Sequence, residues 1–359
     1  MHEESSAAGS GARQGVTYAV LAAVLFGAST PFAKLLLRHS APVVLAGLLY
    51  AGSGLGLSIW IALRAAVRAR PAASAWRRSD LLWLAAAILT GGVLGPVLMM
   101  TGLRSIPAAN ASLLLNLEGV FTALLAWFVF RENLDRRVLA GLLAIVGGGV
   151  VLAWPARLAP AGALGSACIA GACVCWALDN NMTRKISIQD PFVIAALKGV
   201  TAGTLNLGVG AYLGLLTPGV AEVGAAALLG FAGYGISLTL FVLALRHLGA
   251  ARTGAYFSTA PFIGAVASLA VFRHMPGPAM AAAAVLMGIG VWLHLTEKHV
   301  HHHTHAPLLH MHSHRHDEHH RHTHHFDWDG REPHEHEHRH EPRSHTHAHF
   351  PDIHHRHEH

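Results

Sequence analysis

Long apolar runs recur along most of this 359-residue chain. A helix that crosses a membrane needs about 20 mostly apolar residues, because each residue adds about 1.5 Å and the hydrocarbon core is about 30 Å thick. Ten segments reach or approach this length, and short connections separate them. The sequence therefore predicts an all-α integral membrane protein with ten transmembrane helices. We place them at residues 15–37, 41–62, 81–102, 107–130, 138–154, 162–183, 191–216, 221–245, 253–272 and 278–295.

Charged residues are few and lie mainly between these segments. They make up 13% of the chain, against about a quarter of an average soluble domain. With the N-terminus inside the cell, the inner connections hold twelve Lys and Arg residues and the outer ones hold five. Because cytoplasmic loops are enriched in Lys and Arg, we expect an inner-membrane protein with both termini in the cytoplasm. The bilayer is then its main partner, and the net charge of +6 does not indicate nucleic-acid binding.

The two halves of the chain resemble each other. A shift of 142 residues aligns glycines, an arginine and a phenylalanine, and five helices per half is an odd number. The halves are therefore expected to have opposite orientations in the membrane, an architecture common among secondary transporters. We expect an N-terminus at 1–14, repeats at 15–154 and 155–298, and a tail at 299–359. The aligned pairs include Gly91 with Gly233, Arg104 with Arg246, and Phe130 with Phe272.

A motif in the fourth segment resembles the EamA-type signature of the drug/metabolite transporter superfamily. It reads Leu-Leu-Leu-Asn-Leu-Glu-Gly-Val-Phe at 113–121, followed by Ala126-Trp127 and by Arg-Glu-Asn-Leu at 131–134. Gly119 stands where this family usually has proline, and His274 replaces the usual glutamate of the second half. The resemblance implies ten helices and transport of small metabolites, amino acids or drugs without ATP. A third class, a membrane-embedded enzyme, would need a catalytic set such as His-Glu-x-x-His or Gly-x-Ser-x-Gly, and the predicted spans contain neither, so we expect no enzymatic activity.

Three ionisable residues stand out inside the apolar segments: Glu118, Asp179 and Lys198. A charge at the bilayer centre costs about 2.5–3.5 kcal/mol, so such residues are functional candidates. A hairpin that turns near residue 188 brings Asp179 and Lys198 to a similar depth, where they are expected to form an ion pair. This pair, together with Asn180, either locks two helices together or lines a gated cavity.

Three further side chains complete the predicted site. Glu118 beside Asn116 is a candidate for binding a cationic group or a coupling proton, because burial favours the protonated carboxyl group. Tyr256 is a candidate cavity-lining residue, although aromatic side chains in apolar helices more often serve packing. The predicted substrate-binding or coupling residues are Asn116, Glu118, Asp179, Asn180, Lys198 and Tyr256.

The tail is rich in histidine, with 25 histidines among residues 299–359. It has few apolar side chains, so its composition predicts disorder. Neutral imidazoles in His-x-His spacing are ligands for transition metals. We expect Zn, Ni or Co to bind there. The tail then acts as a metal sensor or as a metal store, or the binding is a neutral consequence of its composition. No cofactor is predicted to be required. The predicted metal ligands are His310, His312, His314, His334, His336 and His338.

Two functions follow from these features. The first is a secondary transporter that exports a small organic solute by alternating access. The second is a divalent transition-metal transporter that uses the tail as sensor or buffer. The second predicts several His, Asp or Cys ligands inside the helical bundle, and few are available there. Nothing in the sequence specifies an oligomer.

Overall fold

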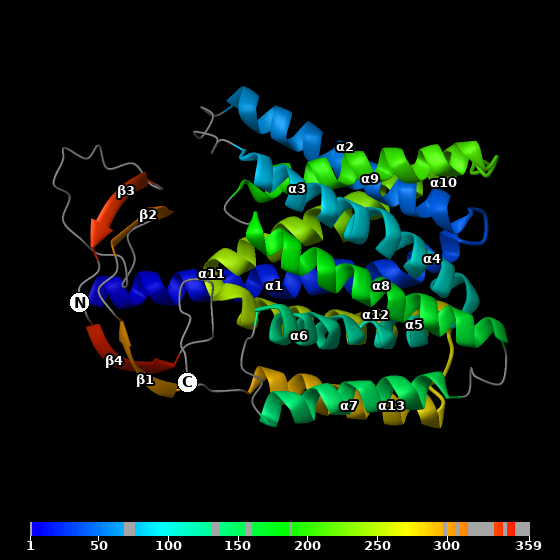
Figure 1. The fold of residues 1–359 in the computed structure, drawn as a ribbon. Coiled ribbons are helices and arrows are strands. Elements are labelled where there is room, and N and C mark those ends of the chain that lie inside the picture. The colour runs from blue at the N-terminus through cyan, green and yellow to red at the C-terminus, as the bar shows by residue number, and fades with distance from the viewer. Residues whose placement is uncertain are drawn as a thin grey trace. The chain divides into compact units, whose positions relative to one another are not determined.

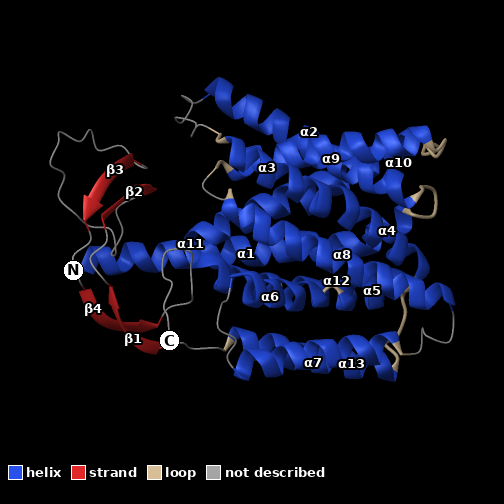
Figure 2. Cartoon of the chain, viewed as in Figure 1, coloured by secondary structure: helices blue, strands red, loops and turns tan. Residues whose placement is uncertain are grey.

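The computed structural model describes residues 2–67, 76–130, 136–154, 160–186 and 189–296, and four short segments of the tail. Contacts divide the chain into a helical unit, Met1–Glu297, and a tail unit, Lys298–His359. All the described helices belong to the first unit and all the described strands to the second (Figure 2). The helices are α1 (His2–Leu36), α2 (Pro42–Val67), α3 (Arg78–Ala87), η1 (Ile88–Leu94), α4 (Gly95–Ser105), α5 (Ala108–Leu114), α6 (Leu117–Phe130), α7 (Arg136–Ala153), α8 (Pro160–Lys185), α9 (Pro191–Tyr212), α10 (Val220–Gly230), η3 (Phe231–Ile236), α11 (Ser237–Phe257), α12 (Ala260–Phe272) and α13 (Pro278–Leu295).

Eight described segments are long and apolar enough to cross a membrane. They agree with the first eight predicted spans to within about five residues at each end. The last two predicted spans correspond to shorter apolar helices, Ala260–Phe272 and Pro278–His294. The eight are Arg13–Leu36, Pro42–Ala66, Arg78–Ser105, Ala108–Leu125, Arg136–Ala153, Pro160–Thr183, Pro191–Tyr212 and Val220–Ala244.

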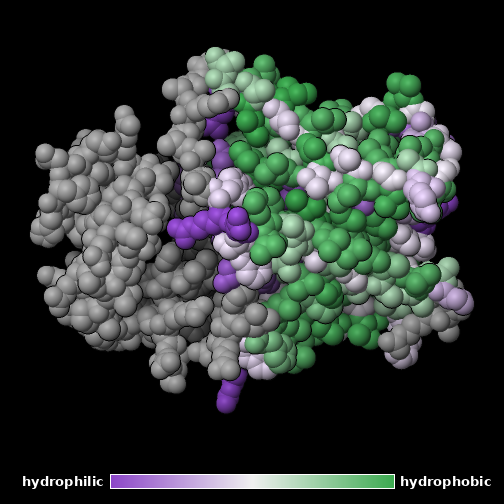
Figure 3. Space-filling model, turned by 45° about the horizontal axis from the view of Figure 1, so that its top comes forward, coloured by the Kyte–Doolittle hydropathy of each residue, from purple (hydrophilic) through white to green (hydrophobic). Residues whose placement is uncertain are grey.

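The surface of the helical unit is apolar. Leu82, Phe128 and Leu228 are 74%, 70% and 69% exposed, and apolar residues dominate the visible face of this unit (Figure 3). In water such a surface would be unfavourable, whereas lipid chains solvate it. The chain is therefore a multi-pass membrane protein.

Prolines and polar side chains set the helix ends. α2, α8, α9 and α13 each begin with proline, whose missing N–H costs nothing in a first helical turn. Asp190 also caps α9, because its carboxylate accepts a hydrogen bond from the Phe192 N–H at 2.9 Å. At the end of α4, Lys34 Nζ donates to the carbonyl oxygens of Leu103, Arg104 and Ile106 at 2.5, 3.0 and 3.0 Å. Lys34 thus stabilises a helix C-terminus.

Helices of the two halves pack against each other in pairs. α2 lies along α9, α1 along α11, α8 along α4, and α7 along α13 (Figure 1). Between α2 and α9 the approach requires glycine: a Cβ on Gly54 would overlap the backbone of Val200, and one on Gly199 would overlap the backbone of Gly54. Small residues let membrane helices approach this closely.

One predicted helix boundary is wrong. The first membrane span begins at Arg13, close to the predicted start, and α1 continues on its N-terminal side to His2; Ala, Glu and Gln in this segment favour helix. A connection was expected around Arg246 and Arg252, yet α11 continues through it. In the first half Pro107 interrupts the chain between α4 and α5, and the residue 142 positions later is Gly249, which allows the helix to continue.

The tail contains four strands where the composition predicted disorder. β1 (Val300–His305) pairs antiparallel with β4 (Arg343–Ala348), and β2 (Leu309–His314) pairs antiparallel with β3 (His334–Arg339). In these pairs the backbone N–H and C=O groups bond across the strands. Disorder of the tail as a whole stays a prediction. The other tail residues, and the basic residues Arg68, Arg70, Arg131 and Arg157 used to predict topology, lie outside the described residues.

Candidate functional site

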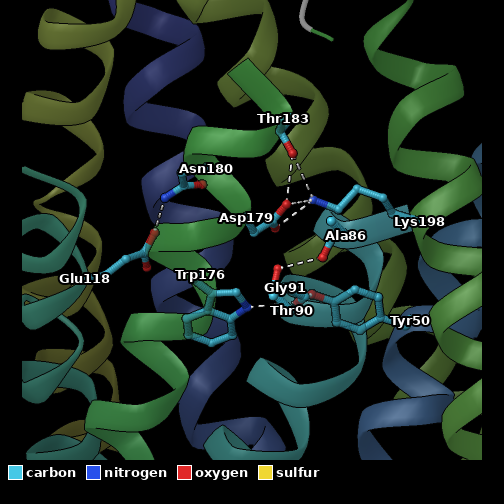
Figure 4. A network of polar contacts seen from close by, with 10 residues as sticks. All are labelled: Tyr50, Ala86, Thr90, Gly91, Glu118, Trp176, Asp179, Asn180, Thr183 and Lys198. Atoms are coloured by element: carbon cyan, nitrogen blue, oxygen red, sulfur yellow. Dashed lines mark hydrogen bonds and ion pairs between the residues drawn. The ribbon is translucent and has the colours of Figure 1, made fainter. Parts of the chain in front are cut away.

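Charge inside the described spans is concentrated in one place. Glu118, Asp179 and Lys198 lie in span interiors, while the other Asp, Glu, Lys and Arg residues of the described spans lie in first or last turns. The three come from α6, α8 and α9, and their side chains belong to one polar network (Figure 4). The network also includes Asn180 and four side chains that were not among the predicted site residues: Tyr50, Trp176, Thr183 and Asn206. We call this set the polar network.

Asp179 and Lys198 form the predicted ion pair. Lys198 Nζ lies 2.5 and 2.7 Å from the two carboxylate oxygens of Asp179, and the two residues are 3% and 8% exposed. Thr183, one turn along α8, donates its hydroxyl to Asp179 Oδ1 at 2.8 Å. This prediction is confirmed, and the two charges neutralise each other.

Glu118 has a different environment. Asn180 Nδ2 donates to Glu118 Oε1 at 2.7 Å, so a neutral amide faces the carboxylate. Among the described residues Glu118 forms no ion pair. It stands in the first turn of α6, where the helix dipole favours a negative charge. Unlike the charge of Asp179, that of Glu118 has no countercharge among the described side chains.

The polar network continues into a π-helical segment of the third span, η1. Gly95 N–H bonds to Thr90 O, five residues back, and Pro96 has no N–H to offer. The carbonyls of Gly91 and Gly92 are therefore left for side chains.

Three side chains bond to these two carbonyls. Gly91 O accepts from Tyr50 Oη at 2.7 Å and from Trp176 Nε1 at 3.0 Å, and Gly92 O accepts from Asn206 Nδ2 at 3.2 Å. Sequence reasoning missed Tyr50 and Asn206. Tyr50 and Asn206 lie 41 and 114 residues in sequence from the carbonyls that they contact, so the sequence gave no signal for these contacts.

Two predicted site residues lie instead at breaks in the helices. The fourth span was expected to be continuous, but it is interrupted at Leu115 and Asn116 between α5 and α6. Asn116 Nδ2 bonds to the Leu113 carbonyl at 2.9 Å, which competes with helical bonding. Asn116 Oδ1 is buried without a partner among the described residues.

The ninth span repeats this arrangement. α11 ends before Ser258 and Thr259, and Thr259 Oγ1 bonds to the Tyr256 carbonyl at 2.7 Å. Asn116 and Tyr256 thus contribute to corresponding breaks. Among the described side chains, neither Asn116 nor Tyr256 forms a side-chain hydrogen bond to a residue of the polar network.

Aromatic rings adjoin the polar network. Phe26 lies 6.1, 5.7 and 5.6 Å from the rings of Trp176, Tyr234 and Phe257, measured between centroids. Tyr50 lies 5.7 Å from Tyr234. We call these five residues the aromatic cluster. Trp176 and Tyr50 belong to both the aromatic cluster and the polar network. The cluster contains Phe257 and not its neighbour Tyr256, which was the predicted cavity-lining residue.

The predicted tail ligands lie in β2 and β3. Their backbone register sets His310 opposite His338, His312 opposite His336, and His314 opposite His334. Their side chains lie outside what the structure describes. Within the described side chains, no three His, Cys, Asp or Glu residues converge as a metal site would require.

Comparison with known proteins supplies the family. The model of the EamA-like transporter family matches residues 13–154 and again residues 163–296. The chain belongs to the EamA-like transporter family. The protein is therefore a membrane transporter, and family membership favours a transporter without enzymatic activity.

Individual relatives agree with this assignment. An uncharacterized transporter of Methanothermobacter thermautotrophicus is 28% identical over 267 residues, which cover 71% of this chain and 78% of that protein. Two shorter matches are probable 4-amino-4-deoxy-L-arabinose-phosphoundecaprenol flippase subunits ArnE. The match from Pseudomonas fluorescens is 40% identical over 75 residues, or 21% of this chain and 63% of that protein. The match from Pseudomonas aeruginosa is 43% identical over 84 residues, or 23% and 70%.

A solved crystal structure has a similar fold. It matches with a TM-score of 0.57 and 22% sequence identity, and the match covers 78% of this chain and 96% of that chain. At this identity the likeness concerns the fold alone.

Proposed function

We propose that this EamA-family protein is a secondary transporter that exports a small organic solute across the inner membrane by alternating access. In this proposal the chain has ten transmembrane helices in two inverted repeats, 15–154 and 155–298, with both termini in the cytoplasm. The solute binds at the polar network, where Glu118, Asp179, Asn180 and Lys198 act in binding or coupling.

The observation that carries the proposal is the position of the polar network between the two halves. Asp179 and Asn180 belong to the second half, whereas their respective partners Gly91 and Glu118 belong to the first. Transporters built from inverted repeats hold their substrates at such an interface. A polar network that served only to lock two neighbouring helices would not need groups from both halves.

Helix packing supports the inverted repeat. α1 and α8 are the first helices of the two repeats, and α4 and α11 are equivalent later ones. α1 packs on α11 as α8 packs on α4, and the equivalent helices α2 and α9 pack on each other. A pseudo-two-fold axis that relates the repeats produces this pattern. Two glycines extend this correspondence to single residues. A Cβ on Gly91 would overlap the Asp179 side chain, and a Cβ on Gly233 would lie 2.7 Å from the Ser29 Cβ. Gly91 aligns with Gly233 at an offset of 142. The first helices of the two halves align at an offset near 150, which sets Lys34 on Arg184 and Ser29 on Asp179.

An organic solute is favoured over a metal ion. The described interior offers amide, hydroxyl, carboxylate and aromatic groups, and no three metal-ligating side chains converge among the described residues. The cargo named for the two flippase subunits is also an organic molecule. The tail remains a proposed binding site for Zn, Ni or Co, separate from the transport path.

Metabolite profiling tests the proposal. Growth medium and cell extract of a deletion strain are compared by mass spectrometry with those of strains that overexpress the wild-type chain or the Glu118→Gln variant at equal membrane abundance. We expect at least one organic solute to accumulate in the medium only with the wild-type chain. Identical profiles in all three strains would contradict the proposed function.

A further inference from the structure

The charge of the polar network defines the kind of solute that fits it. Lys198 neutralises Asp179 through two contacts of 2.5 and 2.7 Å. Within the described part of the chain, Glu118 is held by the neutral Asn180 amide. With all three groups ionised, the interior charge of the described spans sums to −1 − 1 + 1 = −1, and the excess resides on Glu118.

An unpaired carboxylate inside a membrane protein is unfavourable, because the apolar surroundings do not replace the water that solvated it. A cation placed against Glu118 would restore neutrality. An anion would add a second unpaired negative charge. The charge balance therefore favours a positively charged ligand over an anionic one.

Aromatic side chains stand next to this carboxylate. Trp176 and Asn180 are four residues apart on α8 and share one helix face, so the indole ring adjoins the amide that holds Glu118 (Figure 4). Phe26, from α1, lies edge-on to Trp176, with 6.1 Å between ring centroids. Aromatic faces attract ammonium groups, most strongly where water is excluded.

The rings of the aromatic cluster differ in exposure: Trp176 is 7% exposed, whereas three others are less covered. Phe26, Tyr50 and Tyr234 are half-buried although their rings contact one another between helices, and Glu118 and Asn180 are half-buried as well. Tyr50 and Trp176 direct their polar atoms to Gly91 O. Their hydrogen-bonding groups are thus already occupied, and the rings present mainly carbon surface.

We propose that the site binds organic cations, specifically a primary to quaternary ammonium group attached to an apolar body. The ammonium group lies against Glu118 and the face of Trp176, and the apolar body lies against Phe26 and Tyr234. This inference rests on the proposed transport function, whose solute it specifies. It distinguishes this site from one for a phosphorylated or carboxylated solute.

Binding by a matched pair of probes tests the proposal. Benzyltrimethylammonium and benzylsulfonate share a benzyl group and a tetrahedral head group but differ in the sign of their charge. Each is titrated into the full chain in nanodiscs of zwitterionic lipid, with empty nanodiscs as blank, and heat is measured. We expect binding of the cation and none of the anion. Binding of benzylsulfonate, or of neither probe, would overturn the proposal. The proposed transport function would still be tested separately by the metabolite profiles.

Two variants, each with a matched control, test separately the charge of Glu118 and the aromatic ring of Phe26. Glu118→Gln keeps an oxygen for the Asn180 amide and removes the charge, so we expect affinity for benzyltrimethylammonium to fall at least about tenfold. Glu222→Gln, in the first turn of α10, is the control and should change nothing. Phe26→Leu should weaken binding about three- to tenfold, while Phe128→Leu, on the apolar surface, should not. Equal affinity of Glu118→Gln and the wild type would overturn the assignment.

Discussion

At the residue scale, Gly91 joins the two halves of the site. A Cβ there would overlap the Asp179 carboxylate, and its carbonyl bonds to Tyr50 and Trp176. We expect Gly91→Ala to displace Asp179 from Lys198 and to lower the melting temperature. The control is Gly147→Ala in α7, where a Cβ would meet nothing within 4 Å. Because alanine favours helix over glycine by about 0.5–1 kcal/mol, Gly147→Ala should be neutral or stabilising. Thermal unfolding in detergent measures both, and equal melting temperatures would contradict this role of Gly91.

The ion pair gives a second prediction at this scale. Lys198→Ala leaves the buried Asp179 carboxylate without its countercharge, which costs about 3–5 kcal/mol. The double variant Lys198→Ala with Asp179→Ala removes both charges and should be more stable than Lys198→Ala alone. A double-mutant cycle on unfolding free energies in detergent measures the coupling. Additive effects of the two substitutions would show that the residues do not interact.

Residues of the site differ in how far the sequence reveals them. The Asp179–Lys198 pair was predictable, because both residues are charged, lie in apolar segments and flank one short hairpin. The contacts of Tyr50, Trp176 and Asn206 were not predictable. They depend on carbonyls that Pro96 and the π-helical segment set free, and on which distant helices pack against that segment.

At the element scale, apolar length predicted the spans but not their interruptions. Leu115 and Asn116 read as part of one helix, since neither residue is a strong helix breaker. The break depends on side-chain bonds to carbonyls three residues back, made by Asn116 and, in the second half, by Thr259. The basic residues at 246 and 252 suggested a connection, yet α11 continues because no proline stops it.

The tail provides a prediction for an element as a whole. A chain that ends at Lys298 lacks 25 histidines and keeps every described helix of the helical unit. We expect this truncated chain to insert in the membrane and to release the same organic solute as the full chain. If truncation abolishes transport while the protein remains folded, the tail belongs to the transport path.

Zinc binding by the tail should depend on pH. Imidazole binds metal only when neutral, and its unperturbed pKa is about 6.5. Affinity of the full chain for Zn should therefore be present above this value and fall as the pH drops through it. Equilibrium dialysis at pH 7.5 and 5.5 measures this, with the chain ending at Lys298 as control. Equal Zn binding by both chains would contradict the proposed tail site.

At the scale of the whole molecule, the inverted repeat predicts topology. Reporter fusions after Arg70, Glu132 and the C-terminus should lie in the cytoplasm, and fusions after Arg104 and Arg157 should lie outside. The reason is that the inner connections hold twelve Lys and Arg residues against five in the outer ones. Activity of cytoplasmic and external reporters at each position measures the topology. An external C-terminus would exclude the proposed arrangement.

The central claim is that the polar network is reached alternately from the two sides of the membrane. It is tested with Asn180→Cys in a chain whose three native cysteines are replaced by alanine. A membrane-impermeant thiol reagent is added to right-side-out and to inverted membrane vesicles, with Phe128→Cys, on the apolar surface, as the unreactive control. If the polar network is reached from both sides, the cysteine at position 180 reacts in both kinds of vesicle, and this is the result we expect. Reaction from one side only, or from neither, would contradict it.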